Sequence, residues 1–574
     1  MKWALLVAAT CWACARGEGI LELNVVDAEG VAVPARIELL DDRGEAHVAD
    51  DALTINTECY VVPFPDWASS LQRSQSIDNP YVGTRQFYID GAAHASLPSG
   101  RYRVTASRGV EYRIATAEVE VTSGKQTRVE LVPERWIDMP ALGWFSADDH
   151  LHITRVRRED DARIGTWMRA EDLHIANLLQ MGNAEQFDIT PQYAFGDAGV
   201  YRAGETQLVS GQEHPRTHVL GHTIVLGAEA AIDRRDSYTI YRGFWEEAMR
   251  LGGAAGYAHW GAGHARNGLA IDAPSGLLSF IEVLQFDLPY FEVWYDLLNL
   301  GARLAPSAGT DYPCIPSIPG RERFYTRVDG PPTRASWVDA VRRGRTFVTN
   351  GPMLDFDVGG AGIGDELRLE SPREVRIRGS ARFDPARDDV EKLELVRDGA
   401  VVAEADTRSA EGEIALDVSL PVQVSGWFAL RASGSKVGET PMKTPWFLTP
   451  EVLQAQCRFG CGAWMIERAS FVGSGRARPS AAHTGAVYVN VANVAPSPPA
   501  ALVRETLERL DQLRAKLADE RLDELVVFRP FSEELLVDGV PAADLRRDRQ
   551  ALTALIDAAA AHYRSVPTAS SRVR

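Results

Sequence analysis

The sequence predicts a multidomain protein of the α/β plus β class, in which an α/β barrel lies between two β-sandwiches and is followed by a helical tail. The 574 residues exceed what one hydrophobic core usually supports, so several domains are expected. Two stretches alternate apolar and polar residues with period two, whereas the stretch between them has apolar runs separated by helical ones. These patterns, with an amphipathic segment near the end of the chain, define the predicted architecture.

Residues 1–15 have the features of a secretory signal peptide. Lys2 precedes an apolar run that is too short to span a bilayer and that ends in Ala13-Cys14-Ala15. We therefore expect export to the periplasm or the extracellular space. Cys11 or Cys14 would carry a lipid anchor if the leader were of the lipoprotein type, so anchoring is left open. Later apolar runs are interrupted by charge or glycine, and no transmembrane segment is expected.

Residues 16–135 are predicted to form the first β-sandwich, and residues 361–447 the second. In both stretches, apolar side chains at alternate positions indicate strands with one buried face. The clearest strands are 21–25, 35–39, 102–104 and 117–121 in the first sandwich, and 375–378, 393–396 and 427–431 in the second.

Residues 136–360 alternate strand-like apolar runs with helical stretches, of which 241–251 and 291–301 are the clearest. This βα alternation is typical of an α/β barrel. The C-terminal segment, 448–574, contains an amphipathic helix over 502–517, which we expect to pack on the body of the protein. Its apolar positions are Leu507, Leu510, Leu513 and Leu517.

Removal of the leader would leave an even number of cysteines in a compartment that permits oxidation. They are Cys59, Cys314, Cys457 and Cys461. The C-x-x-x-C spacing of the last two predicts a disulfide between them. Zinc binding by this pair is the alternative, but it needs two further ligands close by, and neither another Cys pair nor a His pair follows at the required spacing.

The charge of the chain and its lack of nucleotide-binding motifs exclude several classes of function. A formal net charge of -18 repels phosphate backbones, so no nucleic acid partner is expected. The sequence has no Gly-x-Ser-x-Gly elbow, no P-loop, and no Gly-x-Gly-x-x-Gly that follows a strand. A serine hydrolase, a nucleotide kinase and a dinucleotide oxidoreductase therefore lose their usual sequence support.

Histidines and carboxylates in the middle segment follow short apolar runs, as ligands at strand ends do. His150 and His152 are two residues apart, so in a strand both rings project to the same side. Glu213, His222 and His259 each end or follow another apolar run, and Asp311 comes after the run 303–310. The predicted metal ligands are His150, His152, Glu213, His222, His259 and Asp311. A lone histidine is more often a satisfied core group and a lone aspartate a helix cap, but their joint recurrence at strand ends favours a metal centre.

These residues resemble the motifs of the CehA/McbA metallohydrolases, a branch of the PHP (polymerase and histidinol phosphatase) domain superfamily. The resemblance covers about 136–352 and rests on Asp148-x-His150-x-His152, Glu213, Gly221-His222, Ala258-His259, Gly309-Thr310-Asp311 and the closing segment 344–352. It implies a distorted (βα)7 barrel that holds two or three divalent ions. The first β-sandwich is similar to the carboxypeptidase-regulatory-like module.

The sequence departs from the family in two places. Residues 178–183 replace the Asp-His pair that the family usually carries after its second strand, and Tyr312 and Pro313 follow Asp311 where the family often has Asp-x-His. One metal position is therefore expected to be missing or rebuilt. The candidates to replace it are His174, His214, His218 and His264. The alternative is that His174 lies inside a strand and that His214 and His218 cap or line the pocket.

Imidazole and carboxylate ligands without thiolate suit zinc, with manganese or iron as alternatives, and one or two ions are expected. An ion with an open position lowers the pKa of its bound water to about 7 and so generates the nucleophile. The resemblance implies that Glu213 bridges two ions. Asp311 is expected to ligate and to orient or deprotonate the water, which makes Glu213 and Asp311 the predicted catalytic residues.

The sequence therefore predicts an exported hydrolase that cleaves an ester, carbamate or phosphoester bond of a small molecule. The candidate substrate contacts are Arg202, Arg242, Arg321, Arg323 and Tyr312, although arginine is mostly a surface residue. The alternative is a degenerate barrel that keeps a structural ion and binds a ligand or glycan without catalysis, as the altered second motif would allow. The oligomeric state is left open.

Overall fold

The computed structural model of this chain describes residues 17–57, 59, 73–79, 82–217, 220–258, 266–285, 288–289, 291–314, 317–406, 412–434, 480–518 and 542–568. The expected signal peptide and the Cys457–Cys461 pair lie outside these residues. The chain forms several β-sheets with interspersed helices, which confirms the predicted α/β plus β class. Within the described part of the chain, no helix is long and apolar enough to cross a membrane.

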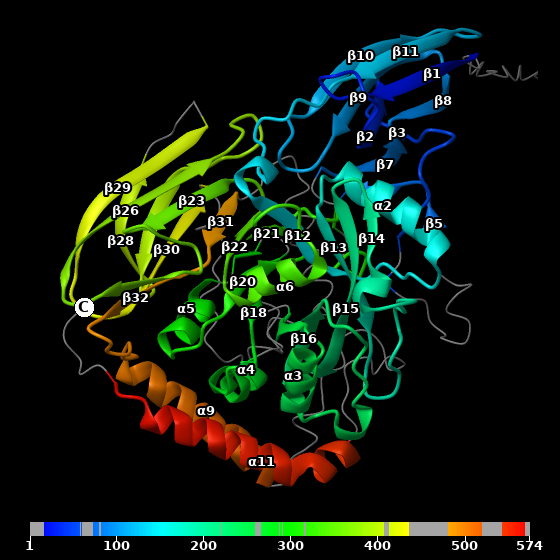
Figure 1. The fold of residues 1–574 in the computed structure, drawn as a ribbon. Helices are drawn as coiled ribbons and strands as arrows, with labels where there is room; N and C mark the ends of the chain where they lie inside the picture. Colours follow the sequence, from blue (N-terminus) through cyan, green and yellow to red (C-terminus); the bar gives the residue numbers. More distant parts are fainter. Residues whose placement is uncertain are drawn as a thin grey trace, which may run out of the picture.

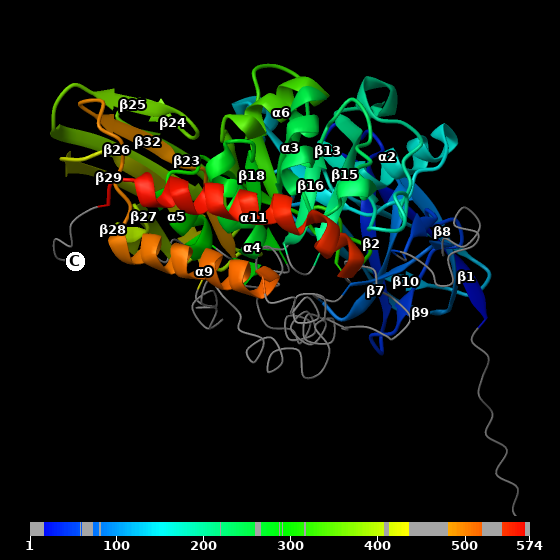
Figure 2. The ribbon, with the colours of Figure 1, turned by 90° about the horizontal axis from the view of Figure 1, so that it is seen from below.

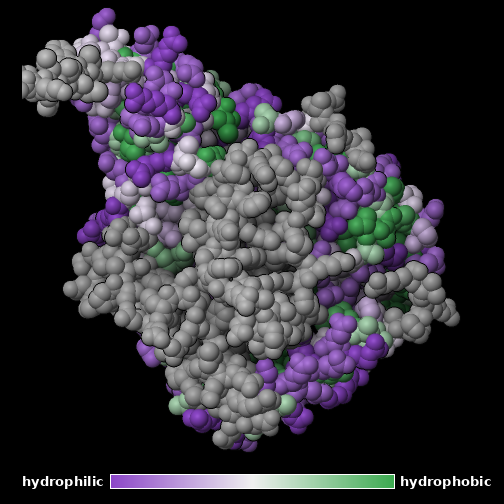
Figure 3. Space-filling model, turned by 180° about the vertical axis from the view of Figure 1, so that it is seen from behind, coloured by the Kyte–Doolittle hydropathy of each residue, from purple (hydrophilic) through white to green (hydrophobic). Residues whose placement is uncertain are grey.

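The N-terminal region is one nine-stranded sheet that encloses its own hydrophobic core (Figure 1). Its strands are β1 (Glu18–Val25), β2 (Pro34–Asp41), β3 (Ala46–His47), β6 (Ile77–Asn79), β7 (Thr84–Asp90), β8 (Ala92–Pro98), β9 (Gly100–Ser107), β10 (Ala115–Val121) and β11 (Gln126–Leu131). A separate pair is β4 (Ile55–Asn56) with β5 (Arg73–Ser74). Buried and exposed positions alternate strictly along β8, as the period-two pattern predicts. Seen from behind, this region carries a mostly hydrophilic outer surface (Figure 3).

The middle region differs from the N-terminal sheet in that its central strands are buried on both faces. Its strands are β12 (Trp144–Leu151), β13 (Ile175–Met181), β14 (Tyr201–Ala203), β15 (Thr206–Thr217), β16 (Gly221–Leu226), β17 (Ala254–Tyr257), β18 (Phe280–Gln285), β19 (Leu288–Pro289), β20 (Ala305–Ala308), β21 (Arg323–Arg327) and β22 (Thr346–Thr349). Every residue of β12, β13 and β15 is buried, including the polar and charged residues of β12 and β15, some of which form the candidate site.

The pairing of these strands brings their ends together. β12, β13 and β15 are parallel neighbours, β16 runs antiparallel between β15 and β17, and β17, β18 and β20 are again parallel. A parallel bridge between Leu151 and Tyr312 then joins the end of β12 to the segment that follows β20. The side chains that follow β12 and β20 are therefore neighbours, although about 160 residues of sequence separate Leu151 from Tyr312.

Helices cover the outside of this middle region (Figure 1). They are α2 (Asp161–Ala170), α3 (Tyr241–Arg250), α4 (Arg266–Asp272), α5 (Phe291–Asn299) and α6 (Arg334–Arg342). The predicted helices at 241–251 and 291–301 are confirmed as α3 and α5. Both present an apolar stripe to the core, which includes Trp245 on α3 and Trp294 on α5.

The third region is a β-sandwich that includes strands from two distant parts of the chain. Its strands are β23 (Met353–Val358), β24 (Ala361–Gly362), β25 (Glu366–Leu369), β26 (Arg373–Arg382), β27 (Lys392–Arg397), β28 (Ala400–Asp406), β29 (Glu413–Val422), β30 (Gly426–Ser433), β31 (Ala481–Thr484) and β32 (Val487–Val491). β31 pairs with both β22 and β30, so the predicted boundary at residue 447 does not separate the tail from this sandwich. Ala482, Val487 and Val489 of the returning strands are buried in the same core as Ile377 and Leu430.

Two long helices end the described chain and lie side by side beneath the middle region (Figure 2). They are α9 (Ala500–Ala518), which contains the predicted helix at 502–517, and α11 (Ala542–Ser565). Leu510 and Leu513 of α9 are buried in the core of the middle region. The Tyr563 hydroxyl donates to the carbonyl of Ala270 on α4 at 3.1 Å. The tail thus packs on the body of the protein, as the sequence predicts.

A disulfide between Cys59 and Cys314 links the N-terminal region to the middle region across 255 positions of sequence. The Tyr312 hydroxyl also donates to the carbonyl of Asn56, so two bonds join these segments. A disulfide of this kind indicates an oxidising environment, such as exported proteins encounter.

Candidate metal centre

The site forms where β12 and the segment after β20 come close together. A Cβ atom on Gly309 would lie 2.4 Å from the Cβ of His150 and 2.5 Å from Oδ1 of Asp149, so only glycine permits this approach. The buried Asp148 carboxylate holds the two segments together. It accepts from the backbone N–H of His150 at 3.0 Å, from the Thr310 hydroxyl at 2.7 Å and from the Gly320 N–H at 2.8 Å.

Three donor atoms meet at this point. Nε2 of His150 lies 3.2 Å from Nε2 of His152, and Oδ1 of Asp311 lies 3.4 Å from the first nitrogen and 3.2 Å from the second. His150 and His152 are buried, and Asp311 is 7% exposed. The two rings project to the same side of the chain because they are two residues apart in an extended segment.

The backbone of Asp311 directs its carboxylate to this point. Asp311 has a φ of 56°, in the left-handed region that residues other than glycine rarely adopt. Such a conformation costs free energy and persists where the surroundings fix it. Here the bonds of Thr310 to Asp148 on one side, and of Tyr312 to Asn56 on the other, hold the residue in place.

Glu213, at 0% exposure on β15, extends the cluster. Its Oε2 lies 3.3 Å from Nε2 of His152, and its Oε1 lies 2.9 Å from Nδ1 of His222 on β16. Burial would raise the pKa of Glu213, but Arg216, at 3.6 Å from Oε1, and the bonds from both imidazoles hold it well below its usual value. The carboxylate is therefore ionised at neutral pH and available as an anionic ligand. The buried group of His150, His152 and Glu213 can hold a metal ion.

A second buried carboxylate orients His150. Nδ1 of His150 lies 3.0 Å from Oε1 of Glu282, which is 1% exposed in β18. The ring donates its Nδ1 proton to this carboxylate, which leaves Nε2 as the lone-pair nitrogen that faces Asp311. Burial lowers the pKa of His150 despite the nearby carboxylates, so its ring is in the neutral form that binds metals. Burial, and then the charge of Glu282, raise the pKa of the neighbouring Asp149 well above its usual value.

The structure thus brings together four of the six predicted ligands, His150, His152, Glu213 and Asp311. His222 contacts Oε1 of Glu213, the oxygen that does not face His152, so its ring does not join the three donor atoms. His259 lies outside the described residues, as do the candidate replacements His218 and His264.

The other two candidate histidines lie elsewhere. His174 is one residue before β13 rather than inside the strand, and its Nδ1 is 2.8 Å from the Ser146 hydroxyl. His214 follows Glu213 but points to the opposite side of β15, against the rings of Phe187, Tyr238 and Phe244. Burial lowers the pKa of His214 to about 4, as expected for a neutral core histidine.

The altered second motif has a structural role in the loop that follows β13. The Gln180 amide donates to the carbonyl of Phe187 at 3.3 Å and accepts from the N–H of Gln192 at 3.4 Å. Asn177, in the same strand, donates to the carbonyl of Asp149 at 2.9 Å. At this strand end the amide side chains therefore bind backbone groups.

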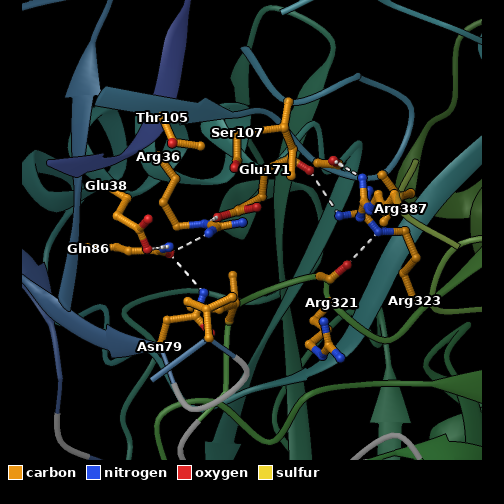
Figure 4. Close-up of a pocket in the computed structure, with 16 residues that line it drawn as sticks. Arg36, Glu38, Asn79, Gln86, Thr105, Ser107, Glu171, Arg321, Arg323 and Arg387 are labelled. Carbon is orange, nitrogen blue, oxygen red and sulfur yellow. Dashed lines mark hydrogen bonds and ion pairs between the residues drawn. The ribbon is translucent and has the colours of Figure 1, made fainter. Parts of the chain in front are cut away.

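The predicted substrate contacts do not gather at the donor atoms. Arg202 is exposed and bonds the carbonyl of Pro332, and Tyr312 is buried against Trp167. Arg321 and Arg323 line a separate cavity of about 410 Å³ between the N-terminal sheet and the middle region (Figure 4). Other residues that line it are Arg36, Glu38, Gln86, Glu171 and Arg387. The cavity adjoins the metal centre through Gly320, whose N–H binds Asp148.

The predicted ligand set does not include four residues that surround the donor atoms, which are Asp148, Glu282, Arg216 and Cys314. Glu282 has a sequence signal, because it is a single charge within the apolar run Phe280–Gln285 and a buried charge usually has a partner. Cys314 has none: it lies three residues after Asp311, but the bond to Cys59 across 255 positions leaves no local pattern in the sequence.

Comparisons with known proteins give no family for this chain. No family model matches it, and no curated protein matches it. Among solved structures, GBS52, the minor pilin of Streptococcus agalactiae, is 15% identical over 22% of this chain and 47% of its own length, with a TM-score of 0.14. A streptococcal ancillary pilin is 15% identical over 23% and 36%, with a TM-score of 0.14. The Bacillus anthracis TIE protein is 11% identical over 72% and 45%, with a TM-score of 0.13. The chain spans less than half the length of each, and likenesses this slight support no argument about fold or function.

Proposed function

We propose that this chain is an exported metal-dependent hydrolase, which uses a divalent cation to activate water against an ester, carbamate or phosphoester bond. The observation that carries the proposal is the spacing of three buried donor atoms. Four ligands at about 2.0–2.1 Å from a tetrahedral zinc ion are about 3.3–3.4 Å from one another. The three donor separations among His150, His152 and Asp311 are 3.2, 3.4 and 3.2 Å, close to the edges of such a tetrahedron.

The surroundings of these atoms also suit a cation. The donors are two imidazoles and a carboxylate, the ligand types that zinc, manganese and iron share in hydrolytic enzymes. Glu282 supports His150 from behind, in the carboxylate–histidine arrangement that is common behind metal ligands. Three protein ligands leave a fourth position open, which is the pattern of catalytic rather than structural zinc sites.

The strand pairings favour the distorted barrel that the PHP resemblance implies. β12, β13, β15, β16, β17, β18 and β20 are joined in that order, and the Leu151–Tyr312 bridge connects the segment that follows β20 to the end of β12. In this proposal the donor atoms lie at the end of a closed barrel, where such folds carry their active sites.

The residues then have distinct roles. A bound cation supplies the chemistry by lowering the pKa of water and polarising the scissile bond. His150 and His152 would hold the cation, and Asp311 would hold it and orient the attacking water. Glu213, with one oxygen toward His152 and the other toward His222, would be the further carboxylate ligand if a second cation were bound. Export is supported by the Cys59–Cys314 disulfide, which persists in oxidising compartments.

A test compares hydrolysis of p-nitrophenyl acetate, a p-nitrophenyl carbamate and p-nitrophenyl phosphate by the full chain before and after chelation and reloading with zinc, manganese or iron(II). We expect at least one substrate to be turned over, activity to disappear on chelation and return with metal, and His150→Ala to be inactive. His94→Ala is the matched control, because His94 is an exposed histidine of the N-terminal sheet. Metal binding without turnover of any of the three substrates would instead favour the alternative, a non-catalytic barrel that binds a ligand or glycan around a structural ion.

A further inference from the structure

We propose that Cys314 is a latent ligand of the metal centre, held in a disulfide by Cys59 and delivered to the cation as a thiolate when a dithiol reduces that bond. The inference rests on the proposed metal centre and adds a ligand that the sequence motifs do not include.

The position of the sulfur carries the argument. Sγ of Cys314 and the donor atoms of His152 and Asp311 all lie within 4.8 Å of one another. Two of these three residues, His152 and Asp311, also belong to the donor triangle, which is the set of donor atoms of His150, His152 and Asp311. The group lies on the side of the triangle that faces the N-terminal region, where Cys59 is bonded to Cys314.

The backbone around Cys314 would remain in place when the disulfide opens. Thr310 is bonded to Asp148, and the Tyr312 hydroxyl is bonded to the carbonyl of Asn56, so neither anchor depends on the disulfide. Cys314 is half-buried, which lets a small reductant reach the bond. A change of one staggered rotamer moves Sγ by about 3 Å, enough to bring it to the fourth position of the cation.

A dithiol supplies the two electrons that open the Cys59–Cys314 disulfide. One thiolate of a dithiol attacks the Cys59–Cys314 bond, its second thiol resolves the mixed disulfide, and the dithiol leaves as a disulfide while both cysteines gain a proton. When Cys314 binds the cation, its thiol proton passes to solvent. The sulfur then fills the position that a hydrolytic centre must keep open. Oxidised protein is therefore the form competent for hydrolysis, and reduced protein binds thiophilic cations more tightly and is inactive.

Cobalt(II) substitution tests the inference separately from activity. Visible d–d bands report tetrahedral cobalt whatever its ligands, and a near-ultraviolet charge-transfer band reports a thiolate ligand. The matched variants are Cys59→Ser and Cys314→Ser in the full chain, because both lose the same disulfide and differ only in which sulfur remains. We expect d–d bands in both variants and in oxidised wild-type protein, but the charge-transfer band only in Cys59→Ser.

A second measurement obtains its main signal from wild-type protein, so that signal does not depend on a variant folding well. Wild-type protein is reduced with dithiothreitol, freed of it by gel filtration without air, loaded with cobalt and then reoxidised. The charge-transfer band should appear on reduction in wild-type protein, stay absent in reduced Cys314→Ser, and disappear on reoxidation. Visible bands without the charge-transfer band in Cys59→Ser and in reduced wild-type protein would overturn this inference alone. Absence of all bands in oxidised wild-type protein would overturn the metal centre itself, and the inference with it.

Discussion

Replacing Glu282 with glutamine should weaken metal binding without weakening the fold. The carboxylate lies 3.0 Å from Nδ1 of His150, and both side chains are essentially inaccessible to solvent. An amide oxygen can still accept the Nδ1 proton, so the ring keeps its orientation, but the negative charge that raises the basicity of Nε2 is lost. Removal of such a partner typically costs 10–100-fold in metal affinity, or about 1.4–2.7 kcal/mol.

The same change should leave the metal-free protein at least as stable. Burial and the charge of Glu282 together raise the pKa of Asp149, so neutralising Glu282 relieves repulsion between two buried acids. The assays are a competitive zinc titration against a chromophoric chelator and urea unfolding of the metal-free protein. Glu370→Gln, at an exposed position, is the control. A change in zinc affinity of less than threefold, or a fall in affinity only in parallel with a loss of metal-free stability, would show that Glu282 does not support metal binding through His150.

Three further changes have defined outcomes. Gly309→Ala places a methyl group 2.4 Å from the Cβ of His150, so we expect zinc affinity to fall at least tenfold and unfolding free energy by about 1–3 kcal/mol, measured by the same titrations; near-normal zinc affinity would contradict the packing argument. Burial lowers the pKa of His483 to about 3, below its unfolded value of about 6.5. The contribution of the neutral His483 ring to the free energy of unfolding is therefore fully present above pH 6.5 and is lost as the pH falls toward 3. Between pH 7 and pH 5 the wild type should lose about 2 kcal/mol more unfolding free energy than His483→Gln, and equal losses would show that His483 is not buried in the neutral form. Leu510→Ala in α9 should cost about 2–5 kcal/mol in urea unfolding while zinc affinity stays unchanged, whereas an unaltered unfolding midpoint would mean that the tail helix does not pack on the middle region.

Periodicity in the sequence predicts most strands and helices of this fold because burial and pattern coincide there. The alternation in β8 and β26 and the apolar stripe of α9 are visible without the structure. The return of β31 and β32 to the sandwich is not visible. β31 is the short segment Ala-Ala-His-Thr, which has a single β-branched residue and no alternation, and only its pairing with β22 and β30 makes it a strand.

The candidate site likewise has a part that the sequence predicts and a part that it does not. His150, His152 and Asp311 lie at or just past the ends of β12 and β20, as their strand-end pattern predicts, whereas Glu213 lies inside β15, which continues to Thr217. The supporting residues depend on contacts between distant segments. Glu282 reaches His150 across 132 positions, and Cys314, three residues after Asp311, is bonded to Cys59 across 255 positions. No local pattern encodes such contacts, so sequence reasoning finds the ligands more readily than what surrounds them.

An anomalous-difference map of the zinc-loaded protein, collected on both sides of the zinc absorption edge, tests the central claim most directly. We expect a peak present only above the edge, about 2.0–2.2 Å from Nε2 of His150, Nε2 of His152 and a carboxylate oxygen of Asp311. A map with no peak among these three residues, or with zinc bound only elsewhere on the protein, would contradict it.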